Sequence, residues 1–231
     1  MITKRIGLTN NALKIIALIT MTVDHIGVIF FPRIMAFRII GRISMPIYAY
    51  MIAEGCRYTK NKLRYFLTVF SLALICQIAY YVNNNSLEMT TLVSYSFSML
   101  LIYLINWAMK SKKYYAIILA ISSFLLVGLL YYILPKKIPN FSFNYGVFCV
   151  TLPIGIYLAK GKWIKLLACG IGLVLIVLDN IEVPLQWWSL VALVPLALYN
   201  GKRGKLRIKY LFYLYFPLHF VVLYGIKLLI G

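Results

Sequence analysis

The chain has 231 residues, of which 63% are hydrophobic and only 13% are charged. Its mean hydropathy of +0.87 excludes a soluble globular protein. Segments of about 20 apolar residues, the length that crosses a bilayer, recur along the whole chain. We therefore predict an all-α, polytopic integral membrane helix bundle that forms a single domain over residues 1–231.

Short polar breaks divide the chain into about nine predicted membrane spans. In chain order these spans cover residues 10–31, 36–57, 63–82, 92–109, 114–134, 143–159, 164–178, 184–199 and 208–230. The first span carries Lys14, Asp24 and His25, and no small-residue cleavage pattern follows it. We expect this span to be retained rather than removed as a signal peptide.

Lysine and arginine fall mostly in alternate loops, which indicates how the chain is oriented. Cytoplasmic loops of membrane proteins are enriched in these residues, so the pattern predicts a cytoplasmic N-terminus and a multi-pass protein of a bacterial cell membrane. The net charge of +19 is then mostly explained by the Lys and Arg residues of the cytoplasmic loops, and it does not indicate a nucleic-acid partner. The cytoplasmic set is Lys4, Arg5, Arg57, Lys60, Lys62, Arg64, Lys110, Lys112, Lys113, Lys160, Lys162, Lys165, Lys202, Arg203, Lys205, Arg207 and Lys209.

Cysteine spacing and motif content leave few kinds of chemistry open. The four cysteines lie in or beside predicted spans without CxxC spacing, so we interpret them as packing residues. Two widely separated histidines do not make a zinc site, and we predict no metal. No phosphate-binding loop or nucleophile elbow is present. Any chemistry must therefore come from polar groups within the membrane.

Ionisable side chains at bilayer depth are costly, so each one needs a partner or a role. In the first span, Asp24 and His25 lie about 10 Å from the outer boundary at about 1.5 Å per residue. Arg38 and Arg42 share one face of the second span, and Arg42 lies at the depth of Asp24, which predicts an Asp24–Arg42 ion pair. Pro46 cannot donate to the carbonyl of Arg42, so we expect the span to kink there.

The inner ends of the first two spans carry a second pair of opposite charges. Lys14 and Glu54 each lie about one turn from the cytoplasmic boundary, and we expect them to neutralise each other. The helix face that carries Lys14 also carries Leu18, Met21 and His25, which makes it a candidate track for a long ligand. The alternative is that Lys14 only extends its charge to the membrane surface.

The second histidine, His219, lies in the last predicted span, within YLFYLYFPLHF at residues 210–220. With a helix tilt of about 20°, its depth is compatible with a cavity shared with His25. A histidine among tyrosines is more often a packing residue. However, both histidines of the chain lie at bilayer depth, and this favours a functional site.

Several segments resemble a known family. The run LKIIALITMTVDHIG at residues 13–27, followed by IIGRISMPIYAYMIAEG at 39–55, is similar to the N-terminal signature of the TraX family of membrane acetyltransferases. The later segments that resemble this family are FNYG at 143–146, QWWSL at 186–190, YNGKRG at 199–204 and FYLYFPLHF at 212–220.

The resemblance implies transfer of an acetyl group from cytoplasmic acetyl-CoA to an amine or hydroxyl of an envelope acceptor, such as a peptide N-terminus or a glycan. His25 is then the candidate general base, and Asp24 fixes its surroundings or holds Arg42. Arg42 or His219 would supply positive charge to the developing oxyanion. The candidate residues for binding acetyl-CoA are Lys14, Lys202 and Arg203, with Arg38 and Glu54 as second choices.

Two other classes of protein remain open at this stage. A small proton-coupled transporter would also place Asp, Glu, Arg and His within the membrane. Such a transporter would typically show an inverted repeat, and the segments at 13–27 and 39–55 have no second copy. A non-enzymatic membrane scaffold would explain the basic loops but not the two intramembrane histidines.

Overall fold

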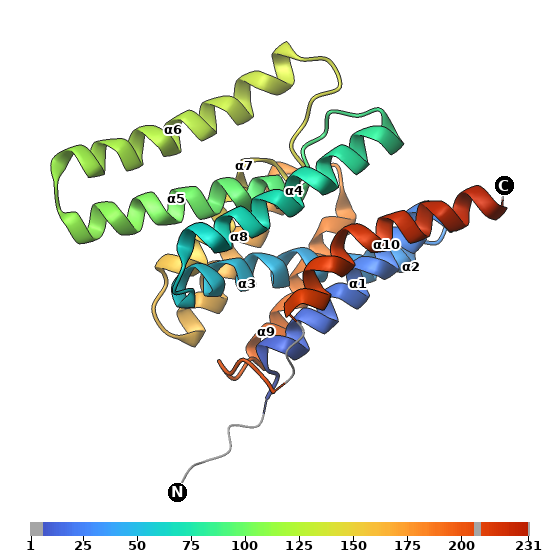
Figure 1. Ribbon diagram of the computed structural model, residues 1–231, viewed down its shortest axis with the longest axis horizontal. Coiled ribbons are helices and arrows are strands. Elements are labelled where there is room, and N and C mark those ends of the chain that lie inside the picture. Colours follow the sequence, from blue (N-terminus) through green and yellow to red (C-terminus); the bar gives the residue numbers. More distant parts are fainter. Residues whose placement is uncertain (1–6, 206–208, 231) are drawn as a thin grey trace, which may run out of the picture.

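The computed structural model describes residues 7–205 and 209–230, and within these ranges the chain is all-helical (Figure 1). The predicted cytoplasmic residues Lys4, Arg5 and Arg207, and the start of the last predicted span at Ile208, lie outside the described residues. The elements are α1 (Asn10–Phe30), α2 (Met35–Gly41), α3 (Ser44–Tyr58), α4 (Lys62–Asn84), α5 (Thr91–Ser111), α6 (Tyr114–Lys137), α7 (Gly146–Leu158), α8 (Lys162–Asp179), the 3₁₀ helix η1 (Pro184–Ala192), α9 (Leu193–Ala197) and α10 (Lys209–Ile230).

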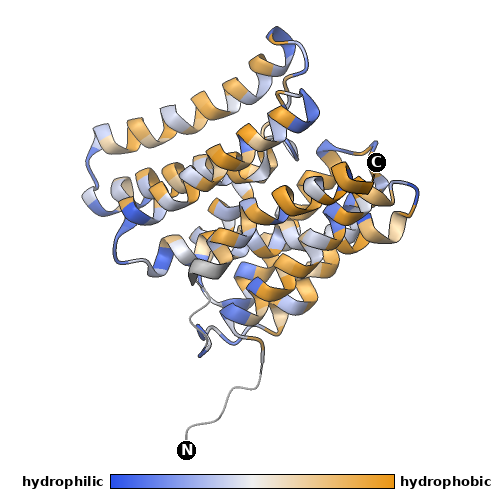
Figure 2. Cartoon of the chain, turned by 45° about the vertical axis from the view of Figure 1, so that its right-hand side comes forward, coloured by the Kyte–Doolittle hydropathy of each residue, from blue (hydrophilic) through white to orange (hydrophobic). Residues whose placement is uncertain are grey.

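Five helices in the described residues are long and apolar enough to cross a membrane. They are α1, α4, α5, α6 and the Phe212–Ile230 part of α10, and their bounds agree with the predicted spans to within a few residues. Figure 2 shows apolar residues along these helices and polar residues gathered at loops and helix ends. The other predicted spans correspond to shorter or interrupted elements. For example, α7 has 13 residues, which extend about 20 Å at 1.5 Å per residue.

The second predicted span is two helices rather than one. α2 ends at Gly41 and α3 begins at Ser44, so the chain turns at Arg42 and Ile43. The hydroxyl of Ser44 donates to the Gly41 carbonyl at 2.8 Å across this turn. Pro46 lies in the first turn of α3, where a missing N–H is tolerated. The expected interruption is therefore present, and it takes the form of a helix break just before the proline.

α3 is the central helix of the bundle. All but four of its 15 residues are buried, because α1, α5, α7 and η1 pack around it. In Figure 1, α5 and α6 form a hairpin with α6 outermost, whereas α1 and α10 run side by side on the opposite flank of the molecule. The chain therefore places two membrane-length helices, α1 and α10, against each other beside a buried core helix.

The loop that precedes α10 is hydrogen-bonded to the beginning of α1. The backbone N–H groups of Asn10 and Asn11 donate to the carbonyls of Lys202 and Arg203 at 2.8 and 3.2 Å, which satisfies two of the free donors at the helix start. Gly204 has φ +89°, and a Cβ there would lie 3.0 Å from the side-chain nitrogen of Asn11. Glycine is thus required at this position, and the YNGKRG segment is fixed beside α1.

Candidate functional site

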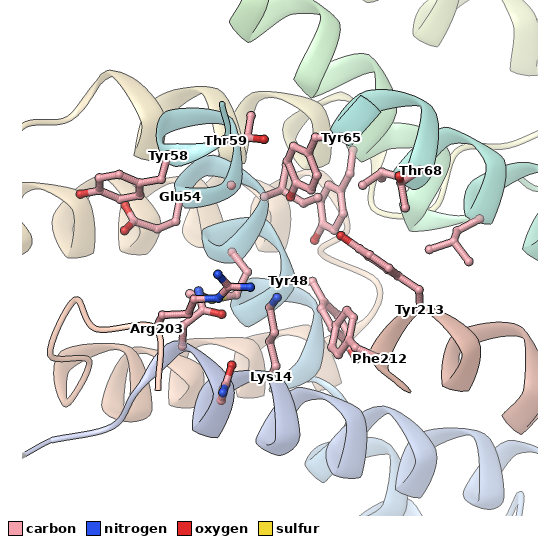
Figure 3. A pocket seen from close by; sticks show the side chains of 18 of the residues that line it. Lys14, Tyr48, Glu54, Tyr58, Thr59, Tyr65, Thr68, Arg203, Phe212 and Tyr213 are labelled. Carbon is pink, nitrogen blue, oxygen red and sulfur yellow. The ribbon is translucent and has the colours of Figure 1, made fainter. Parts of the chain in front are cut away.

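A cavity of about 670 Å³ opens at the end of the bundle where α1 and α10 begin and α3 ends. Lys14 of α1 and Arg203 of the loop before α10 converge on one side of it, and Glu54 and Tyr58 of α3 lie across from them (Figure 3). Lys60 in the loop before α4 and Arg64 in the first turn of α4 add two further positive charges to the lining. This excess of basic groups suits an anionic ligand.

Aromatic side chains line the part of the cavity that lies further along α10. The ring of Tyr48 packs edge-on against Phe212 and Phe216, with centroid separations of 5.9 and 5.2 Å. The Tyr48 hydroxyl donates to the sulfur of Met21 at 3.7 Å. Tyr48 and Phe216 therefore form an aromatic wall between the cavity and the middle of α1.

The two histidines form a hydrogen-bonded pair just beyond this wall. Nδ1 of His25 lies 2.9 Å from Nε2 of His219, and the two ring planes are 21° apart with their centroids 5.0 Å apart, so the rings meet edge to edge. Phe220 packs on both rings at 4.4 Å, and Phe216 meets His219 edge-on at 6.3 Å. The structure thus brings together the two residues whose depths had predicted a shared site, although neither one lines the cavity itself.

Asp24 pairs with Arg38 rather than with Arg42. The Asp24 carboxylate lies 3.2 Å from Nη1 of Arg38 and packs against Gly41, whereas Nη1 of Arg42 donates to the Tyr145 hydroxyl at 2.7 Å. The predicted Asp24–Arg42 pair is wrong because Arg42 has a competing partner in the Tyr145 hydroxyl, directly ahead of α7. The backbone N–H of Arg42 still donates to the Arg38 carbonyl, so the two arginines share a face as predicted, and Arg38 is the one that reaches Asp24.

The Asp24–Arg38 pair can be tested with a double-mutant cycle. Its side chains are 20% and 30% exposed, so we expect a coupling free energy of about 1 kcal/mol. Asp24→Asn and Arg38→Leu together should destabilise the protein by less than the sum of the two single changes. The measurement is the free energy of unfolding in detergent. A larger coupling between Asp24→Asn and Arg42→Leu would contradict this assignment.

Glu54 forms its ion pair with Lys165 of α8. The predicted Lys14–Glu54 pair is therefore wrong, because the cation that pairs with Glu54 is Lys165. Nζ of Lys165 lies 2.5 Å from Oε1 of Glu54, and the two side chains are only 10% and 5% exposed. Nζ of Lys14 lies over the ring of Phe212, 5.1 Å from its centroid. Comparing depths on two helices could not reveal a closer cation on a third helix. Glu54 and Lys14 still share the cavity.

The residues predicted to bind acetyl-CoA fall into two groups. Lys14, Glu54 and Arg203 line the cavity. Lys202 is exposed in the same loop as Arg203 but is not among the described residues of the lining. Arg38 lies beside Asp24, well along α1 from the cavity mouth. Only the first group is therefore placed where it can contact a ligand in the cavity.

Three features of the site were missed from the sequence. Tyr145 holds Arg42 and lies in the FNYG segment, whose resemblance to a family element was the available signal. Lys165 had been counted as one more basic residue of a cytoplasmic loop, although it is buried. The aromatic wall carried no signal, because aromatic residues occur throughout this chain, with 19 tyrosines and 13 phenylalanines.

Possible metal ligands are dispersed in the described part of the chain. Over residues 7–205 and 209–230, no three His, Cys, Asp or Glu side chains come together as a metal-binding group. The four cysteines are each buried and free.

The apolar helices, with polar groups buried between them, define an all-helical membrane protein. The family model described as TraX protein matches residues 9–227, so the chain belongs to the TraX family. An uncharacterized protein of Rickettsia prowazekii (strain Madrid E) is 44% identical over 52 residues. That match covers 22% of this chain and only 21% of the relative's length. No solved structure matches this chain.

Proposed function

We propose that the chain is a membrane-embedded acetyltransferase that moves an acetyl group from cytoplasmic acetyl-CoA to an amine or hydroxyl of an envelope acceptor, either a peptide N-terminus or a glycan. The observation that carries this proposal is the order of groups along the cavity. One part of its lining is basic, the part along α10 is aromatic, and Phe216 of that part contacts His219 of the His25–His219 pair. Acetyl-CoA has the matching order of polyanionic nucleotide, long thin arm and thioester.

The cavity lining supports this fit group by group. Lys14 and Arg203 line the cavity, and in this proposal they bind the phosphates, since charged hydrogen bonds to phosphate are among the stronger ones. From Lys14, the face of α1 leads to His25 over 11 residues, or about 16 Å at 1.5 Å per residue. The arm reaches His25 along this face only when the side chains of Tyr48 and Phe216 rotate out of the wall.

The groups around His25 support a general-base mechanism. The neutral His25 ring takes the proton of the acceptor as the acceptor attacks the thioester carbonyl. Arg42 has an Nε–H that lacks a hydrogen-bond partner among the described residues, which makes it the candidate donor to the oxyanion. Asp24 holds Arg38 and is a positioning residue in this scheme.

We also propose a topology for the chain. The chain crosses a bacterial cell membrane about nine times, with a cytoplasmic N-terminus and an external C-terminus. In this topology α2 and α3 together make the second crossing, and η1 and α9 together make the eighth. The cavity mouth is built from segments that carry predicted cytoplasmic charges, among them Lys60, Arg64 and Arg203. Acetyl-CoA would therefore enter from the compartment in which it is made.

The cavity assignment is tested by a matched pair of variants in one loop. Arg203→Gln should weaken acetyl-CoA binding about 10-fold or more, because a hydrogen bond between charged groups contributes about 1.5–3 kcal/mol. Lys202→Gln removes the same charge one residue away, outside the lining, and should change the Kd by less than about twofold. Both values can be measured by titration calorimetry in nanodiscs. Equal effects of the two variants would show that the cavity is not the binding site.

A small proton-coupled transporter is the second candidate. The buried Glu54–Lys165 pair and the Asp24–Arg38 pair are the kind of intramembrane charges that proton-coupled transport uses. Incubation of the protein in nanodiscs with radiolabelled acetyl-CoA and an envelope extract separates the two functions. Label in an acceptor supports the transferase. Proton uptake by proteoliposomes without any labelled acceptor supports the transporter.

A further inference from the structure

Both ring nitrogens of His219 are engaged in hydrogen bonds. Nδ1 lies 3.0 Å from the backbone carbonyl oxygen of Tyr215, one turn earlier in α10, and Nε2 lies 2.9 Å from Nδ1 of His25. A carbonyl oxygen only accepts hydrogen bonds, so Nδ1 of His219 carries the proton. In a neutral imidazole the other nitrogen then bears the lone pair, and Nε2 of His219 must be an acceptor.

The same argument fixes the tautomer of His25. Because Nε2 of His219 accepts, Nδ1 of His25 must donate, and a neutral His25 keeps its lone pair on Nε2. The hydrogen bonds thus run in one direction, from His25 through His219 to the Tyr215 carbonyl. The hydroxyls of Tyr215 and Thr22 are 2.7 Å apart, which ties α10 to α1 next to the pair.

We propose that His25 and His219 form a two-histidine relay, in which Nε2 of His25 accepts the proton and His219 is the positioning residue that holds this tautomer. This inference rests on the proposed acetyltransferase function and specifies its base to one atom. Asp24 does not orient the His25 ring in this relay, since its Oδ2 accepts from Arg38 and its Oδ1 makes no hydrogen bond to His25 or to any other described residue. His219 takes the place that a carboxylate or carbonyl has behind most catalytic histidines.

The proton and the electron pairs balance over one turnover. A lone pair of the acceptor nitrogen or oxygen forms the new bond to the thioester carbon, the carbonyl π pair moves onto the carbonyl oxygen, and the N–H or O–H bond breaks as its proton moves to Nε2 of His25. The oxyanion pair then re-forms the carbonyl as the C–S bond breaks, and the sulfur leaves with its electron pair as the CoA thiolate. This thiolate takes the proton from Nε2, which restores the neutral pair. Between the two transfers His25 is an imidazolium, and its hydrogen bond to His219 is strengthened by the charge.

The relay predicts a defined nitrogen spectrum for the resting protein. The chain has two histidines, so ¹⁵N-histidine labelling gives one pair of ring nitrogens from each. We expect both rings in the Nδ1–H form, with Nε2 of each as the unprotonated nitrogen. Free imidazole side chains favour the opposite tautomer, so this result would not arise by default. An Nε2–H tautomer at either histidine would overturn the relay.

Variants at position 219 separate positioning from simple packing. His219→Leu should shift His25 toward the Nε2–H tautomer and lower kcat for acetyl transfer by about 100-fold or more, with KM for acetyl-CoA nearly unchanged. His219→Gln supplies a carbonyl oxygen that accepts from Nδ1, so it should restore the His25 tautomer and part of kcat. Phe220→Leu removes a ring that packs on both histidines and should leave the tautomers as in the wild type.

The two readouts distinguish failure of the relay from failure of the proposed function. If His25 keeps its Nδ1–H tautomer in His219→Leu, then His219 does not position it, and the relay is wrong even when acetyl transfer is observed. Absence of acetyl transfer in a wild-type protein with both Nδ1–H tautomers would overturn the enzymatic role of the relay and the proposed function, while the assigned hydrogen bonds would stand.

Discussion

His25→Ala should lower the rate of acetyl transfer by about 10²- to 10⁴-fold, the range that a positioned general base contributes. Acetyl-CoA affinity should remain nearly unchanged, because His25 is not among the lining residues of the cavity. The transfer rate can be measured in nanodiscs by single-turnover incubation with radiolabelled acetyl-CoA and an envelope extract. A loss of rate without a loss of binding would place His25 in the chemical step.

Two controls make this result specific to the imidazole. Imidazole added to His25→Ala should restore part of the rate, since the deleted ring leaves space beside His219 and Phe220. Asp24→Asn removes the adjacent charge but keeps the ring and its bond to His219, and it should cost less than His25→Ala. A transfer rate in His25→Ala equal to that of the wild type would rule out His25 as the base.

The lengths of the membrane helices were predictable because they depend on local composition. The predicted span at 10–31 corresponds to α1 (Asn10–Phe30), and the span at 114–134 to α6 (Tyr114–Lys137). The bilayer sets one length for all such segments, and hydropathy along the chain reveals it. The segment at 184–199 was less predictable. It is apolar like a membrane span, but it folds as the short 3₁₀ helix η1 followed by the five-residue α9.

The partners of the charged residues were less predictable than their depths. Depth along a helix follows from the rise per residue; the depths of His25 and His219 were compatible with a shared cavity, and the two rings are in contact although neither lines the cavity. Ion pairing also depends on how each helix is rotated and on which third helix lies nearby. For this reason Asp24 was assigned to Arg42 instead of Arg38, and Lys165 was left out of the site altogether.

The loop segments show what a motif contributes that periodicity does not. In YNGKRG, the backbone conformation of Gly204 and the carbonyls of Lys202 and Arg203 dock the loop on α1. In FNYG, Tyr145 adopts φ 64° ahead of α7 and accepts a hydrogen bond from Arg42. In both segments the backbone conformation determines where a candidate site residue lies, Arg203 in the first case and Arg42 in the second. Hydropathy along the chain does not encode that conformation.

Lys165→Met should reduce the free energy of unfolding by about 3–5 kcal/mol, because it leaves the Glu54 carboxylate buried without its cation. The two side chains are among the least exposed charged groups in the described residues. The measurement is denaturant or SDS-induced unfolding of the purified protein in detergent. Such a loss would show that the Glu54–Lys165 contact holds α8 against the central helix α3 at the cavity wall.

The double variant Glu54→Gln/Lys165→Met tests whether this loss comes from the unpaired charge. With both charges removed, most of the stability should return, since replacing a buried pair costs much less than breaking it. Lys162→Met is the matched control. It lies one turn earlier on α8, is exposed, and should change stability by no more than about 0.5 kcal/mol. A double variant as unstable as Lys165→Met alone would mean that the loss does not come from the unpaired Glu54 charge. In that case Glu54 would not need a cation to remain in the cavity wall.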